Sequence, residues 1–201
     1  MTWQQRHALK TYWPMYGIEP EELKKPESVF TRQAPLTVEI GFGKGDSLLE
    51  MAVANPQRNY LGIEVFRPGI GNLLNGIYKE KLENLKVVNR DSTEVLGYLP
   101  PDGVDCLQVF FPDPWPKRKH HKRRLINSTL LDLASSKLAP GGCLHIATDW
   151  LDYAEQIRSL LSAHPAFIET EAPDRPETRY EKRGLRLGHE VFDIAYCTRC
   201  S

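Results

Sequence analysis

Short apolar runs alternate with amphipathic segments along most of this chain. The apolar runs predict seven strands, at residues 36–40, 60–63, 85–88, 104–110, 143–147, 167–168 and 191–196. Between them, apolar residues recur at i, i+3 and i+4, which predicts helices at residues 46–54, 68–83, 125–138 and 153–163, and a short helix after Ser92. Pro140-Gly141-Gly142 is expected to stop the helix of residues 125–138. This alternation predicts an α/β fold, with a mainly parallel sheet covered by helices on both faces.

Two segments lie outside the alternation. One is an N-terminal arm, residues 1–33, and the other is residues 171–189, which are rich in charge and proline. A packing arm and a loose loop would be the simplest interpretation. Because neither segment has the apolar periodicity of a core element, we expect both to flank a site within a single domain of residues 1–201.

The overall charge limits the range of partners. Lys plus Arg and Asp plus Glu both total 26, so the net charge is zero. A neutral average argues against a general nucleic-acid coat protein but allows a local basic patch. The chain has no apolar run that could span a bilayer and no signal segment, so we expect a cytoplasmic protein without a membrane partner. The pattern favours neither a monomer nor a homodimer.

The four cysteines do not indicate a metal site. Cys106 and Cys143 fall in predicted strands, where cysteine serves as a small core residue. Cys197 and Cys200 form one C-x-x-C pair with no second pair and no nearby histidine. We therefore expect no bound metal.

The most distinctive stretch of the chain is residues 111–124. Three prolines stiffen its first half, so Asp113 and Trp115 have few alternative positions. Six of the eight residues from Lys117 to Arg124 are Lys or Arg, and the other two are histidines. A surface turn followed by a basic helix would also produce this composition. However, the preceding run 104–110 predicts a buried strand, and open α/β sheets bind ligands at the carboxyl ends of their strands.

A glycine loop follows the first predicted strand. Gly41, Gly43 and Gly45 alternate with other residues, which allows a sharp turn and close approach of a ligand to the backbone. The spacing is neither that of a dinucleotide-binding motif nor that of a P-loop. The loop by itself is weak evidence for a cofactor site.

Carboxylates near the ends of consecutive strands strengthen the prediction. Glu64 ends the second strand, where an acid can bind two ribose hydroxyls, and Asp91-Ser92 end the third, where Asp91 can bind an adenine amino group. With Glu39 they surround one crevice with negative charge. Singly, each could be a helix cap or a surface charge. Together they would repel a pyrophosphate and favour a cationic adenosine derivative. S-adenosyl-L-methionine is such a ligand.

Several segments resemble bacterial tRNA (guanine-N7-)-methyltransferases, which methylate guanine 46 in the tRNA variable loop. The resemblance covers nearly the whole chain, and the proline-tryptophan segment is its most specific part. The matching segments are residues 8–14, 38–45, 62–65, 89–92, 111–117 with the basic run after it, 147–149 and 178–184. Where the family usually has Thr-Lys-Phe-Glu, this chain has Thr178-Arg179-Tyr180-Glu181, which keeps the charge and the aromatic ring.

The resemblance implies a Rossmann-like class I methyltransferase fold of seven strands, the last one antiparallel. Asp113 would be the catalytic or guanine-contacting carboxylate. The cofactor would be bound by Glu39, Gly41, Gly43, Gly45, Glu64, Asp91, Ser92 and Asp113. The substrate would be bound by Lys117, Asp149, Thr178, Arg179, Tyr180 and Glu181, and the RNA would be contacted by Lys119, His120, His121, Lys122, Arg123 and Arg124.

The chemistry of guanine N7 simplifies the expected reaction. N7 has a free lone pair and no proton, so it can attack the sulfonium methyl group directly, without a general base. The enzyme must position the two groups in line, which can contribute about 7–11 kcal/mol in ideal cases. Asp113, Asp149 or Glu181 could face the base, and Trp115 or Tyr180 could stack on it.

Two alternatives to this function remain at the level of sequence. Pro112-Asp113-Pro114-Trp115 resembles the Asp-Pro-Pro-aromatic turn of amino-group methyltransferases, although the intervening proline would place the groups differently. The other alternative is an RNA-binding module without catalytic activity. An intact cofactor crevice with Glu39, Glu64 and Asp91 argues against it.

Overall fold

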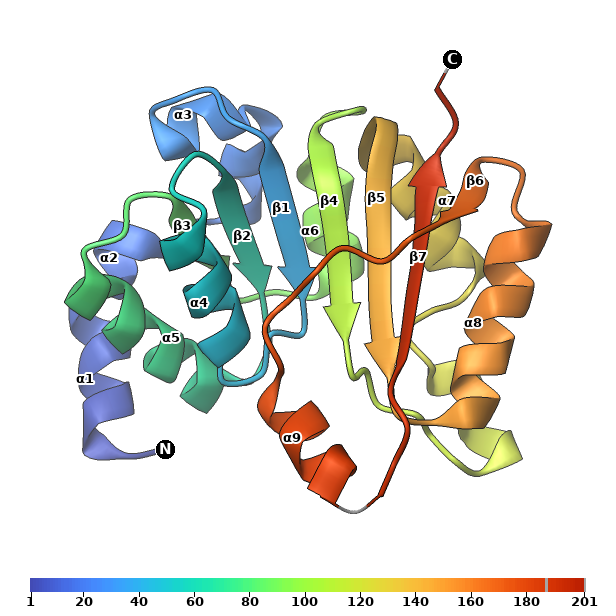
Figure 1. Ribbon diagram of the computed structural model, residues 1–201. Helices are drawn as coiled ribbons and strands as arrows, with labels where there is room; N and C mark the ends of the chain where they lie inside the picture. Colours follow the sequence, from blue (N-terminus) through green and yellow to red (C-terminus); the bar gives the residue numbers. More distant parts are fainter. Residues whose placement is uncertain (187, 201) are drawn as a thin grey trace.

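Seven strands form one sheet through the middle of the molecule in a computed structural model, which describes residues 1–186 and 188–200 (Figure 1). The strands are β1 (Leu36–Ile40), β2 (Asn59–Ile63), β3 (Leu85–Val88), β4 (Val104–Phe110), β5 (Leu138–Thr148), β6 (Phe167–Thr170) and β7 (Phe192–Thr198). Their order is β3-β2-β1-β4-β5-β7-β6. β7 is antiparallel to both β5 and β6, and the pairings among β1 to β5 are parallel. The mainly parallel sheet with an antiparallel last strand is confirmed.

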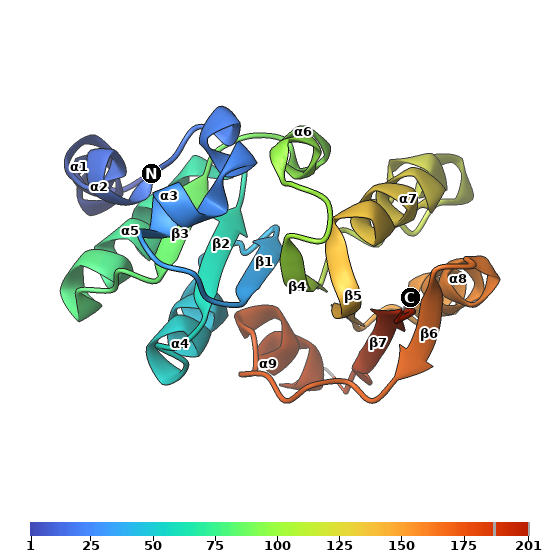
Figure 2. The ribbon, with the colours of Figure 1, turned by 90° about the horizontal axis from the view of Figure 1, so that it is seen from above.

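Helices cover both faces of this sheet. Figure 2 shows α4 and α9 on one face and α3, α6 and α7 on the other. The helices are α1 (Trp3–Thr11), α2 (Trp13–Tyr16), α3 (Pro26–Phe30), α4 (Asp46–Ala54), α5 (Arg67–Glu80), α6 (Ser92–Tyr98), α7 (Ser128–Lys137), α8 (Leu151–Ala163) and α9 (Arg179–Arg186), with the 3₁₀ helices η1 (Pro20–Lys24) and η2 (Arg118–Arg123). Within the described residues, no helix is long and apolar enough to cross a membrane.

The central strands are buried because helices cover both of their faces. All five residues of β1 and of β2 are buried, including the polar residues Thr37 in β1 and Asn59 in β2. Glu39 is the charged exception in β1, at 2% exposure. A buried charge in such a strand marks a place where the core is interrupted by a site.

Four short helices, α1, α2, η1 and α3, organise the N-terminal arm, which the sequence pattern did not predict. α1 begins with a capping box, in which Thr2 and Gln5 exchange side-chain and backbone hydrogen bonds. The helix packs on α5, and a Cβ on Gly71 would lie 2.6 Å from the carbonyl oxygen of Gln5. These helices are short, so docking to the rest of the molecule stabilises them more than helix propensity does.

Two predicted boundaries were wrong. α7 begins at Ser128 rather than Leu125, because the Asn127 side chain caps it by accepting from Leu130 N at 3.0 Å. The stop at residues 140–142 is not a loop. β5 already starts at Leu138, which pairs with Val104, and the register shift between Val104 and Cys106 accommodates the extra residues as a bulge.

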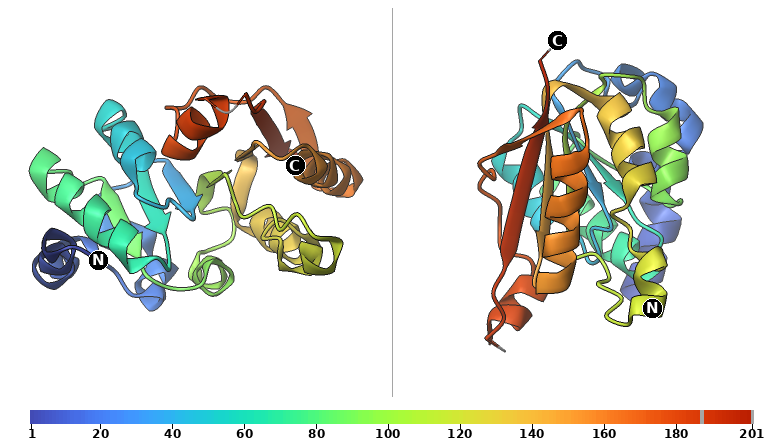
Figure 3. Two further views of the ribbon diagram at one scale, coloured as in Figure 1. Left: turned by 90° about the horizontal axis from the view of Figure 1, so that it is seen from below. Right: turned by 90° about the vertical axis from the view of Figure 1, so that its right-hand side faces the viewer.

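The segment 171–189 also differs from a loose loop. It crosses the sheet in extended form and then forms α9 below the ends of the strands (Figure 1). Seen from below, α9 and η2 lie on opposite sides of the ends of β4 and β5 (Figure 3, left). A charged segment without apolar periodicity thus forms one wall of the site.

Candidate active site

A cleft of about 660 Å³ opens where the carboxyl ends of the first four strands meet. β1 and β4 are neighbours there, so the strand order reverses, which is where open α/β sheets bind ligands. The cleft brings together distant segments that the sequence had singled out: Gly41, Gly43, Glu64, Asp91, Ser92, Asp113, Trp115, Arg123 and Tyr180.

The glycine loop has a backbone conformation that favours glycine. Gly41, Gly43 and Gly45 adopt φ angles of 74°, 59° and 78°. A Cβ on Gly69, in the first turn of α5, would lie 1.7 Å from the carbonyl oxygen of Gly43. The loop therefore packs directly on the helix backbone and presents its own backbone to the cleft.

Glu64 is held in place by three backbone N–H groups. Gly43 N donates to Oε2 at 2.8 Å, and Val65 N and Phe66 N donate to Oε1 at 2.7 and 2.9 Å. These bonds fix the carboxylate at the end of β2 and tie it to the glycine loop. Because a carboxylate has about four acceptor positions, Glu64 can still accept hydrogen bonds from a ligand's hydroxyl groups.

Glu39 is a buried carboxyl group with an incomplete set of hydrogen bonds. It lies at an adjoining hollow of about 230 Å³, and its Oε2 atom has no hydrogen-bond partner among the described residues. Burial raises the pKa of Glu39 to about 8; the nearby Arg175 guanidinium opposes this shift and Glu64 adds to it. A buried carboxylate without a full set of partners suits a site whose ligand brings its own cation.

Asp91 and Ser92 begin α6 at the third strand end. Asp91 Oδ1 caps the helix by accepting from Thr93 N at 2.9 Å and Glu94 N at 3.4 Å. The helix-cap role that we had weighed as an alternative is therefore real. Capping does not exclude ligand binding, because both cap bonds use Oδ1 and Asp91 also lines the cleft.

Backbone strain marks the loop that carries Asp113. Phe111 and Trp115, neither of them glycine, adopt φ of 52° and 44° on either side of the Pro-Asp-Pro turn. Such conformations cost about 1–3 kcal/mol each and cluster at functional sites. Asp113 itself is exposed, and within the described part of the chain it makes no hydrogen bond or ion pair. Its carboxylate can therefore be offered to a substrate.

Arg124 does not contact solvent, which corrects the expectation that it contacts RNA. Its side chain is 1% exposed. The guanidinium donates to the Pro114 carbonyl at 2.8 Å and to side-chain oxygens of Asp152 and Gln156 in α8, and it stacks on Tyr153 at 4.7 Å. Arg124 thus anchors the Asp113 loop to α8. Local charge density could not reveal this, because the partners lie about 30 residues further along the chain.

The rest of the basic run remains on the surface. Arg123 lies over the Trp115 ring at 5.0 Å, and His120 meets the same ring edge-on at 6.0 Å. His121 approaches Asp152 at 3.8 Å. The exposed cations are Lys117, Arg118, Lys119, Lys122 and Arg123. A positively charged surface therefore borders the cleft beside Asp113 and Trp115.

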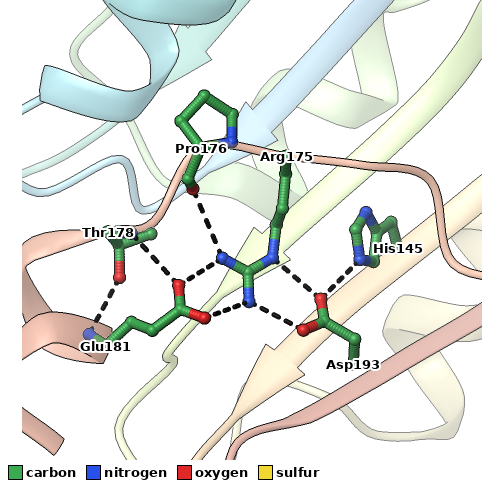
Figure 4. Close-up of polar contacts among 6 residues, drawn as sticks. All are labelled: His145, Arg175, Pro176, Thr178, Glu181 and Asp193. Atoms are coloured by element: carbon green, nitrogen blue, oxygen red, sulfur yellow. Dashed lines mark hydrogen bonds and ion pairs between the residues drawn. The ribbon is translucent and has the colours of Figure 1, made fainter. Parts of the chain in front are cut away.

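An arginine that sequence analysis missed holds α9 against the sheet. Arg175 is 5% exposed and lies between Glu181 of α9 and Asp193 of β7, with bonds of 2.5 and 2.8 Å (Figure 4). Asp193 also pairs with His145 at 2.8 Å. Burial raises the pKa of Asp193, but the bonds from His145 and Arg175 outweigh it, and the pKa falls to about 2. The sequence feature that could have indicated this network is Asp193, a charged residue inside the apolar run 191–196.

The three candidate carboxylates, Asp113, Asp149 and Glu181, differ in their partners. Glu181 is buried and occupied by Arg175 and by Thr178, whose backbone N–H donates to it at 3.2 Å. Asp149 pairs with His189 at 3.0 Å. Of the three, Asp113 alone is without such a partner among the described residues, and it alone lines the larger cleft.

The remaining predicted substrate residues lie on α9. Arg179 Nε pairs with Asp46 Oδ2 at 2.5 Å, which links α9 to the start of α4. Tyr180 is mostly exposed and lines both the cleft and the adjoining hollow, and its ring lies 3.6 Å from where a Cβ of Gly43 would be. Tyr180 therefore covers the glycine loop.

The cleft fits S-adenosyl-L-methionine chemically. Glu39 has an unpartnered oxygen for a cationic amino group, Glu64 is fixed where ribose hydroxyls would be bound, and the bare backbone of the glycine loop allows close approach. By contrast, no group of three or more His, Cys, Asp or Glu in the described chain could hold a metal ion.

Comparison with solved structures agrees with the fold. A 16S rRNA methyltransferase, KamB, matches with a TM-score of 0.65 at 18% identity, over 87% of this chain and 93% of that one. An antibiotic-related methyltransferase matches with a TM-score of 0.61 at 17% identity, over 92% and 95%. The chain thus has the Rossmann-like fold of class I methyltransferases, with an acid-lined cleft at the carboxyl ends of its strands.

Sequence comparison identifies the family. A model described as "Putative methyltransferase" matches residues 33–194. A tRNA (guanine-N(7)-)-methyltransferase from Alkalilimnicola ehrlichii is 48% identical over 99% of this chain and 89% of its own length, and one from Nitrosococcus oceani is 49% identical over 98% and 86%. The chain belongs to the tRNA (guanine-N(7)-)-methyltransferase family.

Proposed function

We propose that this protein transfers a methyl group from S-adenosyl-L-methionine to N7 of guanine 46 in the variable loop of tRNA, in the cytoplasm. The structural observation that carries the proposal is the position of Asp113: it has no intramolecular partner in the described chain and lies in the same cleft as Glu64 and Asp91. The names of near-full-length relatives support the choice of tRNA and of N7.

In this proposal the cofactor residues hold and neutralise a cationic ligand. Glu39 accepts from its amino group and Glu64 from its ribose hydroxyls, and Asp91 with Ser92 borders the adenine. When bound, S-adenosyl-L-methionine supplies a methyl group activated by the positive charge on sulfur. Glu39, which is destabilising without a partner, gains one on binding.

The substrate residues orient the guanine. N7 is already nucleophilic, so the chain supplies position and charge rather than a base. Asp113 accepts from N1 and N2 of the guanine and offsets the positive charge that develops on the purine. Trp115 and Tyr180 border the base, while Lys117, Lys119, Lys122 and Arg123 contact phosphates.

Incubation of undermodified tRNA with labelled S-adenosyl-L-methionine, followed by nucleoside analysis, tests the proposal. We expect 7-methylguanosine, and no product from a transcript in which guanine 46 is replaced by adenine. A methylated exocyclic amine would favour the amino-group alternative. Methylation at another guanine would overturn the assigned position. Cofactor and tRNA binding without any product would indicate a silent RNA-binding module.

A further inference from the structure

A groove separates α1 from α5 on the side of the N-terminal arm. It encloses about 470 Å³ and is lined by Trp3, Gln4, His7, Asn72, Asn75 and Lys79. One of the lining residues is cationic, one is a histidine, three carry amides, one is an indole and none is a carboxylate. The cofactor cleft, by contrast, includes three carboxylates among its lining residues, Glu64, Asp91 and Asp113.

Trp3 is a rigid and exposed aromatic surface. Its side chain is 69% exposed, although large aromatic residues are normally buried. It stacks on the His7 ring, with centroids 5.1 Å apart and planes 10° from parallel. The capping box fixes the helix start beside it, since Thr2 N donates to Gln5 Oε1 at 2.7 Å. The indole is therefore presented to solvent in a defined orientation.

Amides on α5 form the other wall of the groove. The Nδ2 atoms of Asn72 and Asn75 donate to the backbone carbonyls of Lys44 and Gly71 at 2.8 and 2.9 Å, which fixes both side chains. Lys79 follows one turn after Asn75 on the same wall. Fixed polar groups beside a cation and a stacking surface are the features that single-stranded nucleic acids require.

The groove adjoins the proposed active site. Asn72 bonds to Lys44 of the glycine loop, and Lys44 and Tyr180 border one hollow. In Figure 1 the N-terminal end of α1 lies at the same lower side of the molecule as α9, where the parallel strands end. An RNA bound at the cleft could therefore continue along this side as far as α1.

We propose that the groove between α1 and α5 is a second contact for tRNA, in which Trp3 stacks on an unpaired base and Lys79 contacts a neighbouring phosphate. The inference rests on the proposed function, because that function supplies the RNA. The absence of carboxylates among the lining residues and the presence of Lys79 suit a polyanion better than an apolar or basic protein surface.

Binding of undermodified tRNA to the full-length chain tests this proposal at several salt concentrations. We expect Trp3→Ala to weaken binding roughly 5- to 100-fold, which is the effect of losing one base–aromatic stack. The salt slope should stay unchanged, because stacking releases no counterions. Trp3→Phe should restore part of the affinity. Lys79→Ala should instead reduce the slope by about 0.7–0.9.

Matched controls separate the groove from folding and from catalysis. Ile168→Ala removes another exposed apolar side chain, on β6, and should not change tRNA binding. Cofactor affinity and melting temperature should be the same in Trp3→Ala and in the wild type. Wild-type tRNA affinity in Trp3→Ala would overturn the inference, as would self-association of the wild type that Trp3→Ala abolishes.

Methylation assays run in parallel distinguish the two proposals. If the wild type makes 7-methylguanosine but Trp3→Ala binds normally, only the groove is wrong. If the wild type makes no 7-methylguanosine and Trp3→Ala still loses tRNA affinity, only the proposed reaction is wrong.

Discussion

At the scale of single residues, two carboxylates in neighbouring hollows have opposite environments. Glu39 is buried with an unpartnered oxygen, whereas Asp113 is exposed on a strained loop. In the proposed function the first carboxylate faces the cationic cofactor and the second faces the guanine.

Asp113→Asn should slow methyl transfer without abolishing cofactor binding. The substitution removes a negative charge and one acceptor beside the purine, so we expect the single-turnover rate to fall at least roughly tenfold. Because N7 carries no proton, the wild-type rate should be nearly flat from about pH 6.5 to 8.5 with both substrates saturating. A tenfold rise per pH unit would contradict direct attack. Full activity of Asp113→Asn would remove Asp113 from the chemistry.

Glu39→Gln should stabilise the cofactor-free protein at high pH. The pKa of Glu39 rises from 4.5 to about 8 on folding, so the folded state binds this proton more tightly than the unfolded chain does. Its contribution to stability is therefore lost as the pH rises from about 4.5 to about 8. One pKa unit corresponds to about 1.4 kcal/mol, so the gain for Gln at pH 9 should be a few kcal/mol at most.

Thermal unfolding at pH 5 and pH 9 without cofactor measures this effect. The variant should melt higher than the wild type at pH 9, with a smaller difference at pH 5, and it should bind S-adenosyl-L-methionine more weakly. Glu50→Gln, an exposed glutamate on α4, is the control. Identical pH profiles for Glu39→Gln and the wild type would show that Glu39 does not titrate as described.

At the scale of elements, two arginines dock the segments that complete the site. Arg124 ties the Asp113 loop to α8, and Arg175 ties α9 to β7. Charge-assisted hydrogen bonds thus add to the apolar packing of these segments, in which Phe111 packs against the core.

Arg124→Lys should displace the Asp113 loop while it keeps the positive charge at position 124. Lysine keeps the charge but cannot reproduce the planar fork that reaches Pro114, Asp152 and Gln156 together. A displacement of about 1 Å can slow a reaction about a hundredfold, so we expect a lower single-turnover rate with cofactor affinity within about twofold. Arg118→Lys, in the exposed part of the run, should be neutral. A normal rate in Arg124→Lys would contradict the positioning role.

Glu181→Gln should loosen α9. The change leaves the buried Arg175 with one charged partner instead of two, and breaking a buried ion pair can cost about 3–5 kcal/mol. Hydrogen exchange at Lys182 N, which bonds to Thr178 O in the wild type, should accelerate at least roughly tenfold, while exchange in β5 stays unchanged. Glu177→Gln in the same segment is the control. Unchanged protection of Lys182 would mean that other contacts hold the helix.

At the scale of the whole molecule, the net charge is zero but the basic residues are unevenly distributed over the surface. The 26 basic and 26 acidic residues cancel, yet the exposed cations of residues 117–123 gather beside the cleft. Such a local positive field attracts a polyanion to one place without promoting non-specific binding over the whole surface. The tRNA should therefore bind through a limited number of phosphate contacts.

The salt dependence of tRNA binding measures those contacts. Replacing Lys122 and Arg123 by Ala should reduce the slope of log affinity against log salt by roughly one to two units, since each phosphate contact contributes about 0.7–0.9. Replacing Lys24 and Lys25, on and after η1, should leave the slope unchanged. Equal slopes for the Lys122/Arg123 variant and the wild type would make the basic run a solvated surface.

What the sequence alone determined is local in origin. Apolar runs and helical spacing predicted the sheet, because strands that are covered on both faces are mostly apolar. Glu64, Asp91 and the 111–117 loop could be placed at one edge, because parallel strands all end there. The motif of prolines, Asp113 and Trp115 also led to the family, which the comparisons then confirmed.

The tertiary structure decided which charges are available. Arg124 and Arg175 have the same side chain as Arg123, but their side chains are only 1% and 5% exposed, and their partners Asp152 and Asp193 lie 28 and 18 residues away. Neither periodicity nor composition records such pairings. The sequence therefore did not predict that residues 171–189 contain α9, or that Arg124 anchors a loop instead of contacting RNA. The same folding engages two of the three candidate carboxylates: Glu181 pairs with Arg175 and Asp149 with His189, whereas Asp113 makes no such pair among the described residues.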